Sequence, residues 1–161
     1  MQLEIITYRE GPLGPLGHDL CLSAPVLLDE YSAESIRVEI DCRSFDVLGA
    51  IDEGTAEVVP IPKKHRREIL KTVHTQILDT QSHPRALFSG RLDGSTLNGT
   101  LQLMGRNQIV RLDVSRVEGT LVGLGQIKPS HWGIKPYSTF FGALRVRDDV
   151  TIKFSVETAA K

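Results

Sequence analysis

The chain has 161 residues, of which 40% are hydrophobic and 24% charged, and its formal net charge is −1. This size and composition are typical of one globular domain over residues 1–161, and the near-neutral charge argues against nucleic-acid binding through an overall positive field. No apolar run approaches the roughly 18 residues of a membrane-spanning helix, and residues 1–10 do not resemble a secretory signal. We therefore expect a cytoplasmic protein, or a periplasmic one if a signal was removed.

Alternation of apolar and polar residues predicts a series of β-strands, each wetted on one face only. In chain order, strands are expected at residues 3–8, 18–28, 36–43, 86–92, 96–104, 109–118, 121–128 and 144–156, with a shorter extended piece at 55–59. The segment 11–17, a doubled Gly-Pro-Leu, is incompatible with regular helix or central strand and is expected to be a loop.

One segment, residues 63–79, has helical rather than strand periodicity. Its apolar residues recur at the spacing of a helix face, with Pro62 just before the segment and Pro84 just after it. About eight strands joined by short turns favour an antiparallel up-and-down meander, and eight such strands close into a barrel that holds side chains or one small ligand. The sequence thus predicts an all-β, eight-stranded barrel with one flanking α-helix; a two-sheet sandwich would need longer crossing connections.

Four short runs, 78–90, 97–114, 127–134 and 146–152, carry a resemblance to a known family. They contain a helix end and a proline, a Phe-Ser strand, Gly99-x-Leu-x-Leu-x-Gly105, and Val110-x-Leu-x-Val114. In order and spacing they resemble the YceI-like, polyisoprenoid-binding, lipocalin-like family. The resemblance implies a lipocalin-like barrel of eight antiparallel strands whose elongated apolar interior binds or transports an isoprenoid lipid such as an isoprenoid quinone.

Two departures limit what this resemblance transfers. The family usually opens with a His-Ser pair, whereas here the Gly-Pro loop leads into His18. Members of the family commonly carry an export signal, whereas residues 1–10 do not resemble one. The identity of the ligand and the cellular compartment are therefore the least transferable properties.

In a barrel the apolar parity points inward, which defines the expected cavity lining. The residues expected to line it, including two of the loop aromatics, are Leu101, Leu103, Val110, Leu112, Val114, Trp132, Phe140, Ile152 and Phe154. Glycines at positions 90, 99, 123 and 125 are expected to leave the interior partly empty. Trp132, Tyr137, Phe140 and Phe141 form a sequence cluster that could close the open end as a lid or plug the barrel. The alternative is a solid, packed core.

Four cations open the predicted helix, at the positive end of its dipole, where acids are normally favoured. Lys63, Lys64, Arg66 and Arg67 are therefore candidates for contact with an anion, either a prenyl phosphate headgroup or an anionic membrane surface. The alternative is a solvated helix face. His18 is a further headgroup candidate, although a local hydrogen bond at a strand start would also explain it.

The sequence contains no catalytic motif, and Cys21 and Cys42 lack metal-binding spacing, so we expect no enzyme activity, cofactor or metal. A second hypothesis is an interaction module with a packed core that acts through the basic helix start and the Gly-Pro loop. A third is a hydrolase or isomerase that uses His18 and Asp19 as acid and base. The sequence does not decide whether the protein forms a homodimer.

Overall fold

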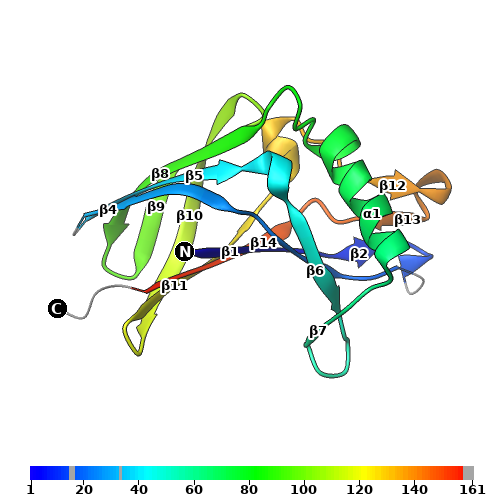
Figure 1. Ribbon diagram of the computed structural model, residues 1–161, viewed down its shortest axis with the longest axis horizontal. Coiled ribbons are helices and arrows are strands. Elements are labelled where there is room, and N and C mark those ends of the chain that lie inside the picture. Colours follow the sequence, from blue (N-terminus) through cyan, green and yellow to red (C-terminus); the bar gives the residue numbers. More distant parts are fainter. Residues whose placement is uncertain (15–16, 33, 158–161) are drawn as a thin grey trace.

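The structure is a computed structural model that describes residues 1–14, 17–32 and 34–157, without the side chains of Leu28 and Phe140. One large antiparallel sheet curls around an apolar interior, and a small sheet and one helix lie at one end (Figure 1). In spatial order the large sheet contains β4 (Val26–Tyr31), β5 (Ser35–Asp41), β8 (Arg85–Asp93), β9 (Thr96–Leu103), β10 (Arg106–Val117), β11 (Thr120–Ile127), β14 (Val150–Glu157), β1 (Gln2–Thr7), β3 (Leu20–Ser23), β6 (Asp46–Ile51) and β7 (Val58–Val59). The small sheet contains β12 (Ser138–Thr139), β13 (Leu144–Val146) and β2 (Arg9–Glu10).

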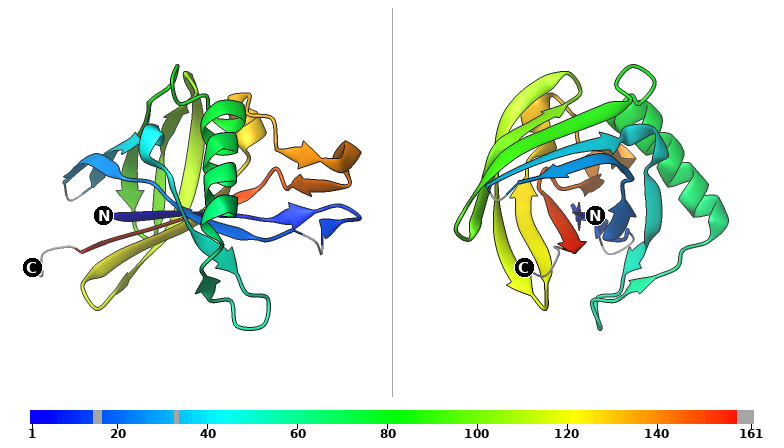
Figure 2. Two further views of the ribbon diagram at one scale, coloured as in Figure 1. Left: turned by 45° about the vertical axis from the view of Figure 1, so that its right-hand side comes forward. Right: turned by 60° about the vertical axis from the view of Figure 1, so that its left-hand side comes forward.

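The curl of the large sheet depends on one interrupted strand. Pro25 has no N–H to donate to a ladder, and it separates β3, which pairs with β1 and β6, from β4, which pairs with β5. The Ala24 N–H still donates to the Leu3 carbonyl, at 3.2 Å. One run of chain therefore serves both ends of the sheet, and the right-hand view of Figure 2 shows the resulting barrel-like wall, which no continuous hydrogen-bonded ladder closes.

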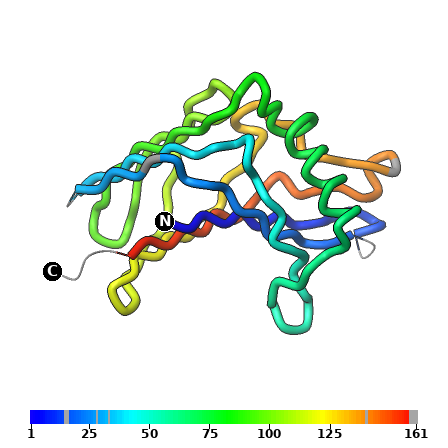
Figure 3. The backbone as a smooth tube through the Cα atoms, viewed as in Figure 1, coloured from blue at the N-terminus to red at the C-terminus, as the bar shows by residue number. Residues whose placement is uncertain are grey.

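Burial along the strands has the period expected from the sequence. In β5, Ile36, Val38 and Ile40 are buried while Arg37 points outward, and β10 buries alternate residues in the same way. Figure 3 shows the first strand, in dark blue, running beside the last strand, in red, in agreement with their antiparallel pairing. The predicted antiparallel, one-sided β-fold with a single flanking helix is confirmed.

The helix α1 spans Lys63–Thr72 and continues as a π-helical turn over Val73–Ile77. The N–H of Leu78 donates to the Val73 carbonyl at 2.9 Å, five residues back, which is the π-helical hydrogen bond. No residue of α1 is fully buried. The helix lies beside β6, at the end of the barrel from which β2, β12 and β13 also project (Figures 1 and 2).

Besides the predicted strand 18–28, which Pro25 divides into β3 and β4, two further parts of the strand prediction differ from the structure. The strand β6 was not predicted, because Gly49 and Ala50 in its second half hide the alternation. The predicted strand 144–156 is divided into β13, in the small sheet, and β14, in the large sheet. Asp148 accepts a hydrogen bond from the Ser130 N–H at 3.0 Å, which fixes the break between the two strands to a neighbouring loop.

Candidate functional site

An apolar cavity of about 220 Å³ lies inside the curled sheet. Its walls are inward-facing side chains of β1, β5, β8, β9, β10 and β14, and none of the described lining side chains is charged. The lining comprises Met1, Leu3, Ile5, Thr7, Leu22, Ile36, Val38, Ile40, Cys42, Phe45, Val73, Ile77, Leu78, Ala86, Phe88, Leu97, Leu101, Leu103, Val110, Leu112, Ile127, Pro129, Ile134, Val150, Ile152 and Phe154. The volume is below the roughly 300–1,000 Å³ of typical small-molecule pockets.

One end of the cavity is closed by packed side chains. Leu97, which is 2% exposed, lines this end together with Phe88 and Phe154. The next inward residues, Val114 and Val156, are buried in the core but lie outside the lining. This is the blind end of the cavity.

The other end of the cavity is covered by the continuation of the helix. Val73 and Ile77 of the π-helical turn line it together with Phe45 and Pro129, and all four are only partly buried. π-Helical turns are frequent at functional sites because they shift side chains relative to an ordinary helix. Here the turn places two aliphatic side chains over the cavity, and we call this the helix end.

The expectation that strand glycines leave empty space was wrong. A Cβ at Gly123 would overlap the ring of Phe154, and a Cβ at Gly99 would lie 2.6 Å from Cζ of Phe88. At Gly125 the space is taken by the Leu112 side chain. The glycines therefore leave room, where a Cβ would lie, for large inward side chains of neighbouring residues. The cavity is the volume that remains between these side chains and the helix end.

The structure brings six of the predicted lining residues together around the cavity: Leu101, Leu103, Val110, Leu112, Ile152 and Phe154. Val114 lies beyond the blind end, as described above, and the side chain of Phe140 lies outside the described residues. Trp132 is 2% exposed and packs in the same core without lining the cavity; its indole Nε1 donates to the Leu101 carbonyl at 2.9 Å.

Of the two alternatives for the aromatic cluster, a lid or a plug, the lid is not seen among the described side chains. Trp132 is buried, Tyr137 is exposed, and Phe141 is fully exposed in the turn between β12 and β13. The cover of the cavity comes instead from Val73 and Ile77. Periodicity could not identify these residues as lining, because it cannot show where a helix packs on a sheet. The lining residues of β1 and β5 could have been found, since they follow the same two-residue period.

Both cysteines are free and buried. Cys42 lines the cavity, and burial, with a smaller contribution from the Asp41 charge, raises the pKa of its thiol to about 11. Burial and then Glu4 raise the pKa of Cys21 to about 11 as well. At neutral pH both side chains are therefore neutral apolar groups rather than nucleophiles.

The predicted cationic residues lie apart from the cavity. Lys63, Lys64 and Arg67 are exposed on α1 and form no ion pair with any described residue, whereas Arg66 pairs with Asp46, with Nε 3.0 Å from Oδ1. Ten helical residues separate Lys63 from Val73, or roughly 15 Å along the axis. This distance favours a contact with an external surface over a contact with a ligand inside the cavity.

His18 is exposed in the loop before β3, and its neighbour Asp19 is held by another residue. The Arg9 backbone N–H donates to Asp19 Oδ1 at 2.9 Å, and the Arg9 guanidinium lies 3.1 Å from the same oxygen. The carboxylate that the acid–base hypothesis requires is thus engaged in an ion pair. Over the described part of the chain, no three His, Cys, Asp or Glu side chains gather as a metal site, and no helix is long and apolar enough to span a membrane.

Comparison with protein families gives a decisive result, because a model described as the YceI-like domain matches residues 23–158. The chain belongs to this YceI-like family. A search of curated proteins found no match for it.

Solved structures share the fold of this YceI-like chain at low sequence identity. Burkholderia cenocepacia BcnA is 20% identical with a TM-score of 0.53, over 96% of this chain and 93% of the other. A polyisoprenoid-binding domain from Saccharophagus degradans, implicated in plant cell wall breakdown, is 13% identical with a TM-score of 0.54, over 96% and 90%. A mutant CJ YCEI protein is 18% identical with a TM-score of 0.52, over 87% and 81%. At these identities the likeness establishes the fold alone.

Proposed function

We propose that this YceI-like protein binds an elongated apolar molecule of the polyisoprenoid or isoprenoid-quinone class in its cavity, as a carrier or sequestering protein without catalytic activity. The observation that carries the proposal is a cavity whose described lining has no charged side chain. Family membership and the neighbour named as a polyisoprenoid-binding domain support the same ligand class.

Burial of the ligand supplies the affinity in this proposal. Removing apolar surface from water contributes roughly 25 cal/mol per Å², so about 200 Å² of buried tail contributes on the order of 5 kcal/mol before the costs of association. A polar headgroup would find no free charged partner at the blind end, because no lining side chain is charged and the α-ammonium group of Met1 already lies 3.8 Å from Asp29 Oδ2. The tail therefore enters first, towards Leu97 and Phe154, and the headgroup stays at the helix end near Val73.

The size of the cavity limits what it encloses. At about 220 Å³ it is smaller than typical ligand sites. A long isoprenoid must therefore either extend past the helix end or displace the π-helical turn, whose residues are only partly buried.

The test combines lipid analysis with a matched pair of variants. Protein purified without detergent is extracted and analysed by mass spectrometry, and the emptied protein is titrated with dansyl-labelled farnesol. We expect a co-purifying prenyl lipid and saturable probe binding. Leu101→Trp fills the cavity and should abolish binding, whereas Thr100→Trp, on the outer face of the same strand, should retain it. A lipid-free extract together with no probe uptake would overturn the proposal.

A further inference from the structure

We propose that the end of the molecule that carries α1 docks on an anionic lipid bilayer, with Phe141 inserted among the lipids and α1 lying against the headgroups. The docking end is defined as Phe141, Lys135 and the exposed cations of α1, namely Lys63, Lys64, Arg67 and Lys71. This inference goes beyond the proposed function, because it concerns the outer surface and not the cavity.

The first observation is the exposure of Phe141. Its exposed fraction is 111%, and its backbone lies in the left-handed region, at φ 55° and ψ 35°. A bulky residue rarely adopts this conformation, which is unfavourable for any side chain with a Cβ. The turn is nevertheless anchored, since the Leu13 N–H donates to the Ala143 carbonyl and Arg145 donates to the Gly142 carbonyl, both at 2.8 Å. The fold thus holds an aromatic ring in water, and this ring gains apolar contacts on entering a bilayer.

The second observation is an excess of unpaired positive charge on α1. The helix contains five Lys and Arg residues and one acid, Glu68. Lys63, Lys64, Arg67 and Lys71 form no ion pair with any described residue. Several acids at the same end are already neutralised by arginines, in the pairs Glu10–Arg145, Asp149–Arg147, Glu53–Arg9 and Asp46–Arg66. The four exposed cations of α1 outnumber Glu68, the one acid of the helix, and therefore give α1 a net positive charge, which the positive end of the helix dipole reinforces.

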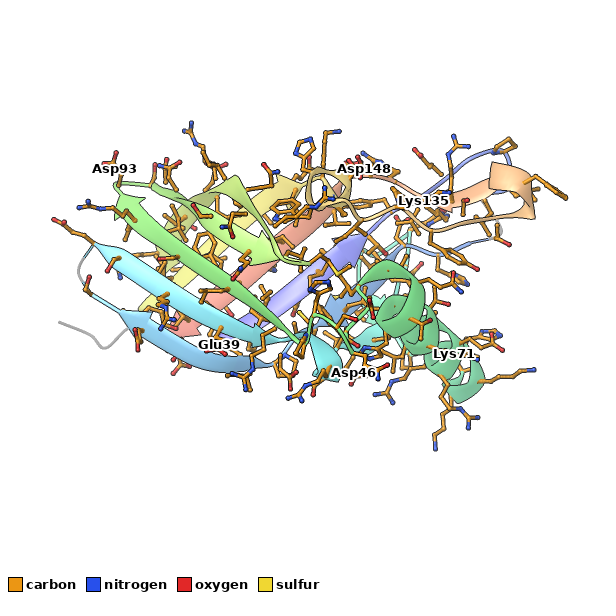
Figure 4. The ribbon with its side chains drawn as sticks, turned by 90° about the horizontal axis from the view of Figure 1, so that it is seen from above. Glu39, Asp46, Lys71, Asp93, Lys135 and Asp148 are labelled. Carbon is orange, nitrogen blue, oxygen red and sulfur yellow. The ribbon has the colours of Figure 1, made fainter. Side chains whose placement is uncertain are left out.

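The third observation is placement. Figures 1 and 4 show the turn between β12 and β13 and the helix α1 at the same end of the molecule, away from the turn that joins β8 and β9. Figure 4 shows Lys71 on α1 and Lys135 on the segment that leads to β12, both at this end. Val73 and Ile77, which cover the cavity, continue directly from α1. A bilayer in contact with α1 would therefore lie beside the helix end of the cavity.

An anionic bilayer fits these features better than a folded partner. One protruding aromatic ring beside a set of flexible lysines is typical of interfacial attachment, which needs apolar insertion and attraction to anionic headgroups but no matching shape. A folded protein partner would instead be expected to meet a contiguous, complementary surface.

The experiment is co-sedimentation with vesicles that contain no isoprenoid, made of phosphatidylcholine alone or with 30 mol% phosphatidylglycerol. Each Lys or Arg near an anionic surface contributes about 1 kcal/mol, or roughly fivefold in partitioning. The triple variant Lys64→Gln, Arg67→Gln, Lys71→Gln should therefore bind anionic vesicles roughly 100-fold more weakly in low salt. Phe141→Asn, which suits the left-handed conformation, should weaken binding about tenfold.

Matched controls carry the same chemical changes elsewhere. They are Ile109→Asn, at a residue 84% exposed on β10, and the triple variant Arg37→Gln, Arg91→Gln, Arg111→Gln on the outer face of the sheet. Both controls should bind like the unchanged protein. Binding by the unchanged protein should disappear in neutral vesicles and fall steeply at 0.5 M salt.

Three results would overturn the docking inference: no sedimentation of the unchanged protein with anionic vesicles, equal losses in the control variants, or loss of vesicle binding in the cavity-filled Leu101→Trp variant. The last variant also keeps the two proposals distinct. If it binds vesicles but no prenyl probe, the docking surface operates independently of the cavity. A protein that sediments with vesicles yet never takes up a prenyl probe would refute the proposed cargo alone.

Discussion

The contact between Gly123 and Phe154 gives the sharpest test of how the cavity is bounded. In Gly123→Ala, the new Cβ would overlap three carbons of the Phe154 ring, the farthest of them 2.6 Å away. Carbon atoms pack at roughly 3.5 Å, so this farthest carbon must retreat by about 0.9 Å and the nearer two by more. Phe154 is buried and lines the cavity, which is the adjacent free space. The ring should therefore move into the cavity at its blind end.

This movement should cost both stability and affinity. Overpacking costs about 1–3 kcal/mol, offset by about 0.4–1 kcal/mol because alanine restricts the unfolded chain more than glycine does. A ring that displaces one methylene group of the ligand removes about 0.8 kcal/mol of burial, so the affinity for dansyl-labelled farnesol should fall about fourfold for each methylene excluded. Fluorescence titration gives the affinity, and urea unfolding gives the stability.

Two variants separate the steric effect from general destabilisation. Gly94→Ala places a Cβ at φ 61° with no atom within 4 Å, so it should destabilise the fold by about 1 kcal/mol without changing affinity. Adding Phe154→Leu to Gly123→Ala should restore part of the binding. The reasoning is refuted if Gly123→Ala remains folded and binds the probe as tightly as the unchanged protein does.

Three further predictions concern single side chains. In a Cys21→Ser background, Cys42 should react only slowly with an apolar maleimide at pH 7, and the reaction rate should rise about tenfold per pH unit up to the thiol pKa of about 11. A ligand that fills the cavity should block the reaction, and rapid labelling at pH 7 would contradict the burial of Cys42. Burial acts to raise the pKa of Asp41, but hydrogen bonds from Ser44 and Arg43 lower the pKa overall. The stability contributed by the Asp41 carboxylate is therefore present above the unfolded pKa of about 3.9 and is lost as the pH falls through the lower folded pKa. Asp41→Asn should lower the free energy of unfolding in urea by about 1–2 kcal/mol at pH 7 and by less at pH 2, and an equal loss at both pH values would contradict the prediction. Trp132→Phe should lower the urea midpoint by the equivalent of about 1–3 kcal/mol, because the Leu101 carbonyl loses its indole donor, and an unchanged midpoint would show that the bond is replaced.

The sequence predicted the features of this protein that local periodicity controls. One-sided strands such as β5 and β10 follow directly from alternation, and alternation also points Leu112 and Ile152 towards the interior. The expected emptiness at Gly123 failed for a tertiary reason, since the Phe154 side chain from a neighbouring strand occupies that space.

Features set by contacts between distant segments were beyond the reach of local patterns. Val73 and Ile77 have ordinary helix spacing, and nothing in that spacing shows that they cover a cavity. Trp132 lies in a polar loop sequence, and its burial depends on the carbonyl of Leu101, 31 residues earlier in the chain. The sequence around Phe141 does not show that this side chain is exposed, because its exposure results from the conformation of the turn between β12 and β13.

The position of β1 between β14 and β3 has a consequence for biosynthesis. A ribosome releases the first strand well before the last, so β1 must wait with one flank unpaired until residues 150–157 have been translated and reach it. Leu3 and Ile5 of β1 and Ile152 and Phe154 of β14 face the same interior. The compartment is thus completed only after β14 has left the ribosome, and any cargo is enclosed after that point.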